Sequence, residues 1–123
     1  MNELAKRPQN AAPVNGSVRW LMPWADVRPA LESGRPVPLT ITVETRDGLV
    51  THGYIVRQLR DGDRVTGYEL ERADCDTRYH LDTSFGGLAH MTCDCPDATW
   101  RERHTGCKHR RGLLAALAKA GVE

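Results

Sequence analysis

The stretch that decides the fold is Cys93-Asp94-Cys95, followed after residues 96–106 by Cys107-Lys108-His109. It offers three thiols and one imidazole in two tight pairs. Zinc prefers four nitrogen or sulfur ligands in a tetrahedron, and a site filled by four protein ligands is structural rather than catalytic. Asp94 and Pro96 supply turn chemistry at the first pair, and Gly106 gives the backbone freedom before the second. The spacing therefore predicts one structural Zn²⁺, bound by Cys93, Cys95, Cys107 and His109.

A helix is expected to begin at the second pair and to span roughly residues 105–120. Leu113, Leu114 and Leu117 form an apolar stripe at helical spacing, and Gly121 is a typical residue to end the helix. Cys107 then lies near the N-terminus of this helix. The partial positive charge of a helix N-terminus favours a thiolate at that position.

Cys-x-Cys, a variable loop and Cys-x-His at the start of a helix resemble the SWIM zinc finger. The strand-rich segment from Tyr68 to Thr92 is similar to the β-hairpin part of that module, so the resemblance covers residues 64–121. Members of this family occur in Mutator-type transposases, chromatin remodellers, recombination factors and a ubiquitin ligase. The family's proposed role is to bind DNA or proteins. The resemblance therefore implies a binding module and leaves both kinds of partner open.

Upstream of this segment, residues 1–17 are rich in Pro, Asn, Gly and Ser and read as a flexible N-terminal arm. Residues 18–22 form a short apolar patch. Residues 24–33 predict a short or broken helix, because Trp24, Val27 and Leu31 share one helical face and Gly34 suits its end. Pro29 argues against a long regular helix, since it removes a backbone hydrogen bond.

From Val37 the apolar residues alternate with polar ones, which predicts strands with one buried face. Asp47-Gly48 indicates a hairpin turn, and Gly53 a bulge or bend in the strand that follows. Turns are expected at residues 60–63 and 73–77. The strands are expected at residues 37–44, 49–59, 65–72, around residues 79–81, and at residues 88–92, after the break at Gly86-Gly87.

These elements predict an α+β fold: a small antiparallel β-meander, then a SWIM-like zinc finger and a C-terminal helix. Residues 18–123 are expected to form a single domain. It would comprise an N-terminal helix and strand part, residues 18–63, and the SWIM-like part, residues 64–121. At 123 residues the chain is long enough for a modest core, which a metal would supplement.

The net charge of +1 hides an asymmetry between the two ends of the chain. Residues 1–99 carry 11 basic and 14 acidic side chains, whereas residues 100–123 carry six basic and two acidic ones. No secretory signal or membrane-length apolar run is visible. We therefore expect an intracellular protein, cytoplasmic or in the nucleoid or nucleus, with no membrane partner.

Two functions fit this sequence. The first is weak DNA or RNA binding by a basic cluster in the inter-ligand loop and C-terminal helix: Arg101, Arg103, Lys108, Arg110 and Arg111. The alternative is a protein-interaction adaptor that recruits a larger partner, one that could itself process nucleic acid, through the sheet or through Trp20 and Trp24.

Catalysis is not expected, because a filled zinc site has no open position and the zinc-deaminase and phosphate-loop motifs are missing from the sequence. No small-molecule substrate is expected either. Trp100 would serve as a stacking platform for a nucleic acid or as a lid over the zinc cluster. Cys75 is a spare thiol that could replace His109 in a rival ligand set. His52, His80 and His90 are expected to be ordinary strand or surface histidines.

Overall fold

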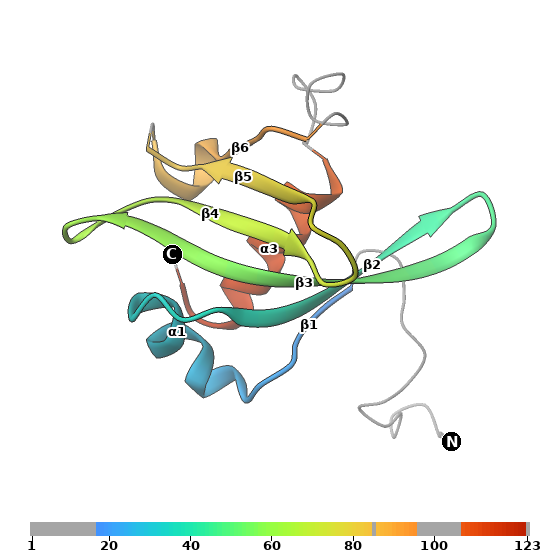
Figure 1. Ribbon diagram of the computed structural model, residues 1–123, viewed down its shortest axis with the longest axis horizontal. Coiled ribbons are helices and arrows are strands. Elements are labelled where there is room, and N and C mark those ends of the chain that lie inside the picture. Colours follow the sequence, from blue (N-terminus) through green and yellow to red (C-terminus); the bar gives the residue numbers. More distant parts are fainter. Residues whose placement is uncertain (1–16, 85, 96–106, 123) are drawn as a thin grey trace.

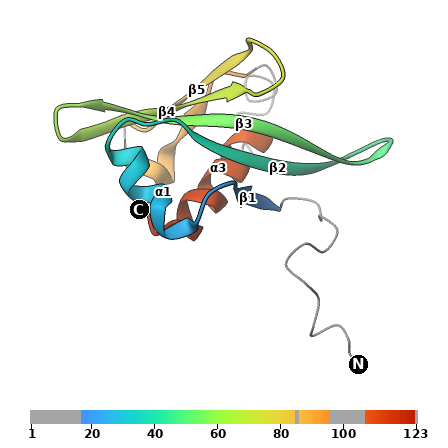
Figure 2. The same ribbon diagram turned by 60° about the horizontal axis from the view of Figure 1, so that its bottom comes forward.

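The computed structural model describes residues 17–84, 86–95 and 107–122. In this part of the chain, six strands form one antiparallel sheet in the order β1-β2-β3-β4-β5-β6, so each strand pairs with the next along the chain. Helices α1 and α3 lie on the same side of the sheet (Figures 1 and 2). The predicted α+β fold with an antiparallel meander and a C-terminal helix is confirmed. The elements are β1 (Val18–Trp20), α1 (Trp24–Glu32), β2 (Val37–Thr45), β3 (Gly48–Asp61), β4 (Arg64–Arg72), β5 (Arg78–Asp82), β6 (Thr92–Cys93) and α3 (Lys108–Lys119).

The alternation in β2, β3 and β4 places one set of side chains under the helices. Leu39 and Ile41 of β2, Tyr54 of β3 and Tyr68 and Leu70 of β4 are all buried. Their neighbours along each strand face the opposite side of the sheet, where Arg57, Arg78, Glu69 and Glu71 form a network of ion pairs. The core therefore lies between the sheet and its two helices.

The β2–β3 hairpin forms where Asp47-Gly48 predicts it, although Arg46 and Asp47 make up the turn itself. Thr45 pairs with Gly48, and Gly48 has a φ of 113°. No non-glycine residue in the described chain has a positive φ, so this is not the type I′ turn that an Asp-Gly pair favours. The Thr45 hydroxyl accepts a hydrogen bond from the Asp47 backbone N–H and closes the turn.

Two expectations about the strands are wrong. No bulge occurs at Gly53, which pairs regularly with Thr40, and the register shift in β3 lies instead between Leu59 and Arg60, in its pairing with β4. Ala73 lies beside Gly53 and donates its backbone N–H to the Gly53 carbonyl, and a Cβ on Gly53 would be in ordinary contact with the Ala73 Cβ at 3.4 Å.

The second error concerns the last strand, which is shorter than residues 88–92. A 3₁₀ helix spans Gly87–His90, and β6 contains only Thr92 and Cys93. Gly86 and Gly87 both have positive φ values, of 90° and 72°. This left-handed backbone turns the chain tightly, and the turn bonds back to the end of β5 through Gly87 N–H and the Thr83 carbonyl.

Helix α1 is continuous across Pro29 and ends at Glu32 with Ser33 as its C-cap, and Gly34 follows the cap as expected, with a φ of 81°. Its buried residues are Val27, Ala30 and Leu31. The expectation that Trp24 shares this buried face is wrong, because its side chain is 69% exposed. Trp24 is the first residue of the helix, and the stripe that meets the sheet begins one turn later.

The apolar patch at residues 18–22 contributes the edge strand β1 and anchors α3. Trp20 is buried and donates its indole N–H to the Ala116 carbonyl at 2.7 Å. Lys119 donates to the Val18 carbonyl at 3.0 Å. Most of the predicted N-terminal arm lies outside the described residues. Ser17, its last residue, accepts a hydrogen bond from Thr42 N–H.

Helix α3 crosses the buried face of the sheet with Gly112 at its closest approach. A Cβ on Gly112 would lie 2.6 Å from the Ile41 Cδ1 and 3.0 Å from its Cγ1 and Cγ2. The missing side chain therefore sets the distance between α3 and β2.

Substituting Gly112→Ala should destabilise the protein even though alanine favours helix. Overpacking costs about 1–3 kcal/mol, against a gain of ~1 kcal/mol in helix propensity. Urea unfolding should show a lower free energy of unfolding for the variant. Adding Ile41→Val removes the nearest methyl group, so the double variant should lose less stability than the sum of the two single changes. A stabilised Gly112→Ala variant would contradict this packing.

Candidate metal centre

The four predicted ligands converge at the end of the sheet where α3 begins. Cys93 ends β6, Cys95 follows two residues later, Cys107 is the N-cap residue of α3, and His109 lies in its first turn. Their ligand atoms all lie within 4.8 Å of one another. The structure therefore brings together the whole predicted ligand set in one cluster that could hold a metal ion.

The distances within the cluster suit a tetrahedral ion. His109 Nδ1 lies 3.9 Å from Cys93 Sγ and 3.8 Å from Cys107 Sγ. A tetrahedron with metal–sulfur bonds of about 2.3 Å and metal–nitrogen bonds of about 2.0 Å has edges of roughly 3.5–3.8 Å. The ligand atoms thus surround a space of the right size for one ion.

Asp94, between the first two ligands, fixes the turn that points them inward. Its backbone N–H bonds to the His80 carbonyl at 3.2 Å, and its carboxylate accepts the His80 backbone N–H at 2.9 Å. Asp94 therefore continues the pairing of β6 with β5 beyond Cys93. On the other side, the Cys107 carbonyl accepts the Arg111 N–H, which places the second pair in the first turn of α3.

Two tyrosines hold the His109 ring. Tyr79 of β5 stacks on it with centroids 4.1 Å apart, and Tyr54 of β3 meets it edge-on at 5.5 Å. The imidazole is buried, with Nδ1 toward the thiols. The sequence marks both tyrosines as strand residues, and only the sheet register shows that they form the wall of the metal centre.

His109 Nε2 is buried and has no hydrogen-bond partner in the described structure. The Nδ1 contacts with two sulfurs leave Nε2 as the nitrogen that carries the proton when an ion is bound. The ring orientation is thus set by the aromatic contacts of the two tyrosines rather than by a hydrogen bond to Nε2.

The thiols of the cluster compete for ionisation. A hydrogen bond from the Cys93 thiol lowers the pKa of Cys107, and the His109 side chain and the Arg110 backbone act in the same direction. The same bond, together with burial, raises the pKa of Cys93. Like charges this close cannot all form without a compensating cation. A divalent ion supplies that compensation, which is the chemistry expected of a thiolate metal site.

The rival ligand set with Cys75 is wrong. Cys75 is exposed, and its thiol donates to the Thr77 hydroxyl at 3.4 Å, outside the cluster. His52, His80 and His90 do not belong to the cluster either.

Arg110 has a structural role that the sequence did not indicate. Its Nε donates to the Met91 carbonyl at 2.7 Å and its second terminal nitrogen to the Ala89 carbonyl at 3.2 Å. These bonds tie α3 to the segment that leads into Cys93. Arg110 thus helps to hold the two ligand pairs together.

The other predicted nucleic-acid contacts are only partly described. Lys108 is half-buried and Arg111 is exposed, both in the first turn of α3 beside the metal cluster. Arg101, Arg103 and Trp100 lie outside the described residues. On the adjacent strands, burial, Lys108 and Arg72 lower the pKa of His52, which favours the neutral imidazole. Arg72 itself is paired with Asp74.

Comparisons with known proteins give no relative: no family model, no curated protein and no solved structure matches this chain. In the described part of the chain, no helix is long and apolar enough to span a membrane.

The two hydrogen bonds from Arg110 to the Met91 and Ala89 carbonyls should strengthen metal retention. Arg110→Gln removes these bonds, and loss of contacts that orient ligands typically weakens metal binding by roughly 10–100-fold. Competition with a chromogenic chelator should show weaker retention in this variant. Arg111→Gln, the next residue in the same turn, is the matched control and should retain metal as the parent protein does. Equal retention in Arg110→Gln and the parent would contradict the structural role of Arg110.

Proposed function

We propose that this protein is a non-enzymatic binding module, held in shape by one structural Zn²⁺, which binds nucleic acid through the surface around the first turn of α3. The observation that carries the proposal is the cluster of three thiols and one imidazole, with ionic side chains of α3 beside it. Its resemblance to the SWIM zinc finger in ligand order and spacing points in the same direction.

The donor set favours zinc. Thiolates select Zn²⁺, Cu⁺ or iron–sulfur clusters, and a single tetrahedral site of three sulfurs and one nitrogen is typical of structural zinc. With four protein ligands, no coordination position is left for water or a substrate. This supports a structural rather than a catalytic ion.

Metal analysis of protein purified without chelator should therefore find one zinc per chain. A content well under one zinc per chain would contradict the assignment of zinc as the bound ion.

Charge supports nucleic acid as the partner and also limits its affinity. Three thiolates on a divalent ion leave one negative charge, so attraction of phosphate depends on the surrounding cations. Among the described residues these are Lys108 and Arg111, in the first turn of α3. The outer face of the sheet is a poor alternative surface, because its arginines are neutralised by Glu69 and Glu71.

The binding test follows from this geometry. Zinc-loaded protein should bind single- or double-stranded DNA or RNA weakly at low salt, with log affinity falling linearly with log salt. Reversing Lys108→Glu and Arg111→Glu should abolish binding while metal content stays at the parent value. Arg110 is left unchanged, because its bonds to Met91 and Ala89 serve the metal centre.

Arg35→Glu with Arg46→Glu is the matched control, since it makes the same change in net charge at exposed positions away from α3. That variant should keep most of its affinity. Binding that survives the Lys108/Arg111 reversal, or no binding to any nucleic acid at low salt, would contradict the proposal.

A protein-adaptor function has one specific observation in its favour. Trp24 is 69% exposed and Leu21 is 50% exposed, and the two lie three residues apart at the start of α1. Tryptophan is enriched at the energetic centres of protein interfaces. Trp20, the other candidate, is buried against α3 and cannot serve. Under this alternative, Trp24→Ala would abolish partner binding and the Lys108/Arg111 reversal would leave it intact.

A further inference from the structure

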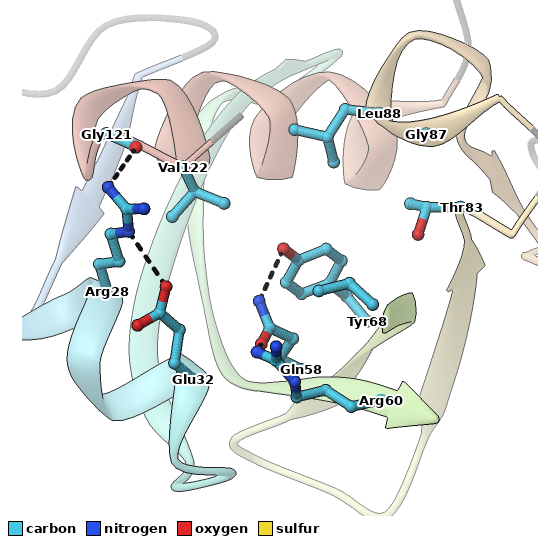
Figure 3. Close-up of a pocket in the computed structure, with 11 residues that line it drawn as sticks. Arg28, Glu32, Gln58, Arg60, Tyr68, Thr83, Gly87, Leu88, Gly121 and Val122 are labelled. Carbon is cyan, nitrogen blue, oxygen red and sulfur yellow. Dashed lines mark hydrogen bonds and ion pairs between the residues drawn. The ribbon is translucent and has the colours of Figure 1, made fainter. Parts of the chain in front are cut away.

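A cavity of about 360 Å³ lies on the helix side of the sheet, away from the metal centre (Figure 3). Its walls come from α1, β3, β4, the segment after β5 and the C-terminal end of α3. The metal ligands stand at the other end of α3, and a helix of twelve residues spans about 18 Å. The cavity is therefore separate from the metal centre, and its volume falls within the range of small-molecule sites.

The floor of the cavity presents a hydroxyl with a proton to donate. Tyr68 is buried, and its oxygen accepts a hydrogen bond from Gln58 Nε2 at 3.1 Å. The Gln58 carbonyl oxygen is in turn occupied by Arg60 at 2.7 Å. Burial raises the pKa of Tyr68, so the phenol keeps its proton at neutral pH. Because Gln58 already acts as the donor in their bond, the Tyr68 proton is available to an acceptor in the cavity.

The opposite wall carries a second hydroxyl, and this one has no partner. Thr83 is only 5% exposed, and its Oγ1 is buried without a hydrogen bond in the described structure. Figure 3 shows it across the cavity from Arg28 and Glu32. Leaving a buried hydroxyl unsatisfied costs stability, and such groups in native proteins call for an explanation. A ligand that accepts or donates a hydrogen bond here would satisfy it.

The charged groups of the cavity favour an anion. Arg60 extends from the floor, and Arg28 lies on α1 with its Nε bonded to Glu32 and one terminal nitrogen to the Gly121 carbonyl. Glu32, the one carboxylate among the lining residues, is thus already paired. The Arg28 guanidinium also covers the carbonyl end of α3, which would otherwise repel negative charge.

We propose that this cavity binds a small organic anion whose carboxylate or phosphate oxygens accept hydrogen bonds from Tyr68, Thr83 and Arg60. Leu88, Val65 and Val122 supply apolar contacts for the rest of the molecule. The anion is assigned as a bound ligand and not a substrate, because the one carboxylate of the lining, Glu32, is held in an ion pair with Arg28. Such a ligand would connect α1, the sheet and the end of α3, since it touches all three.

The test is titration of the full-length, metal-loaded protein with inorganic phosphate in one arm and with succinate and citrate in the other, followed by amide NMR. Saturable shifts at Thr83, Gly87 and Gly121 are expected in at least one arm, and the responding arm identifies the anionic group. Phosphate that moves only the amides of residues 108–111 would place anion binding at the metal centre and overturn this proposal.

Two variants give the test its specificity. Thr83→Val keeps the side-chain shape and removes the unpartnered hydroxyl, so it should weaken binding about tenfold or more while the unliganded protein unfolds at the same or a higher urea concentration. Arg60→Gln should weaken anion binding similarly. Arg46→Gln, at an exposed position in the turn between β2 and β3, is the control and should bind the anion as the parent protein does. No saturable shift with any of the three anions, equal binding in all variants, or shifts produced instead by tetramethylammonium would overturn the proposal.

Discussion

The convergence of two ligand pairs from separate elements is the constraint on which the C-terminal half of this structure depends. Cys93 and Cys95 follow a strand of only two residues, and Cys107 and His109 open α3. So short a strand contributes few backbone hydrogen bonds to the sheet edge. The Asp94–His80 pairing, the Arg110 bonds and the stacking of Tyr79 on His109 all act at this junction. A bound ion would join these contacts into one cross-link between the sheet and the helix.

The position of α3 in turn organises the rest of the core. Trp20 of β1 bonds to the Ala116 carbonyl, and Ile41 of β2 packs against Gly112. The last described element, α3, is thereby joined directly to the first, β1. Its far end closes the cavity beside α1, where Gly121 accepts a bond from Arg28. The metal centre and the cavity therefore lie at opposite ends of α3.

The sequence predicts the regular part of this fold well, because alternation, turn residues and ligand spacing are local signals. The antiparallel meander, the end of α1 just before Gly34 and the four-residue cluster are all confirmed. The failures concern residues whose roles depend on distant partners. Trp24 follows the helical period and yet is exposed, because the sheet meets α1 one turn later. Gly53 pairs regularly with Thr40, and the register shift of β3 lies at Leu59 and Arg60. Arg110 reads as a surface cation, and only the fold shows its bonds to Met91 and Ala89.

Hydrogen–deuterium exchange on the metal-loaded protein and on protein stripped by a chelator tests the central claim most directly. If the four ligands cross-link the sheet to α3, removal of the metal should raise exchange in β5, β6 and the first turn of α3. The central strands β2, β3 and β4 should keep most of their protection, because their backbone pairing does not involve the ligands. Unchanged protection in β6 and the first turn of α3 after complete metal removal would contradict the account.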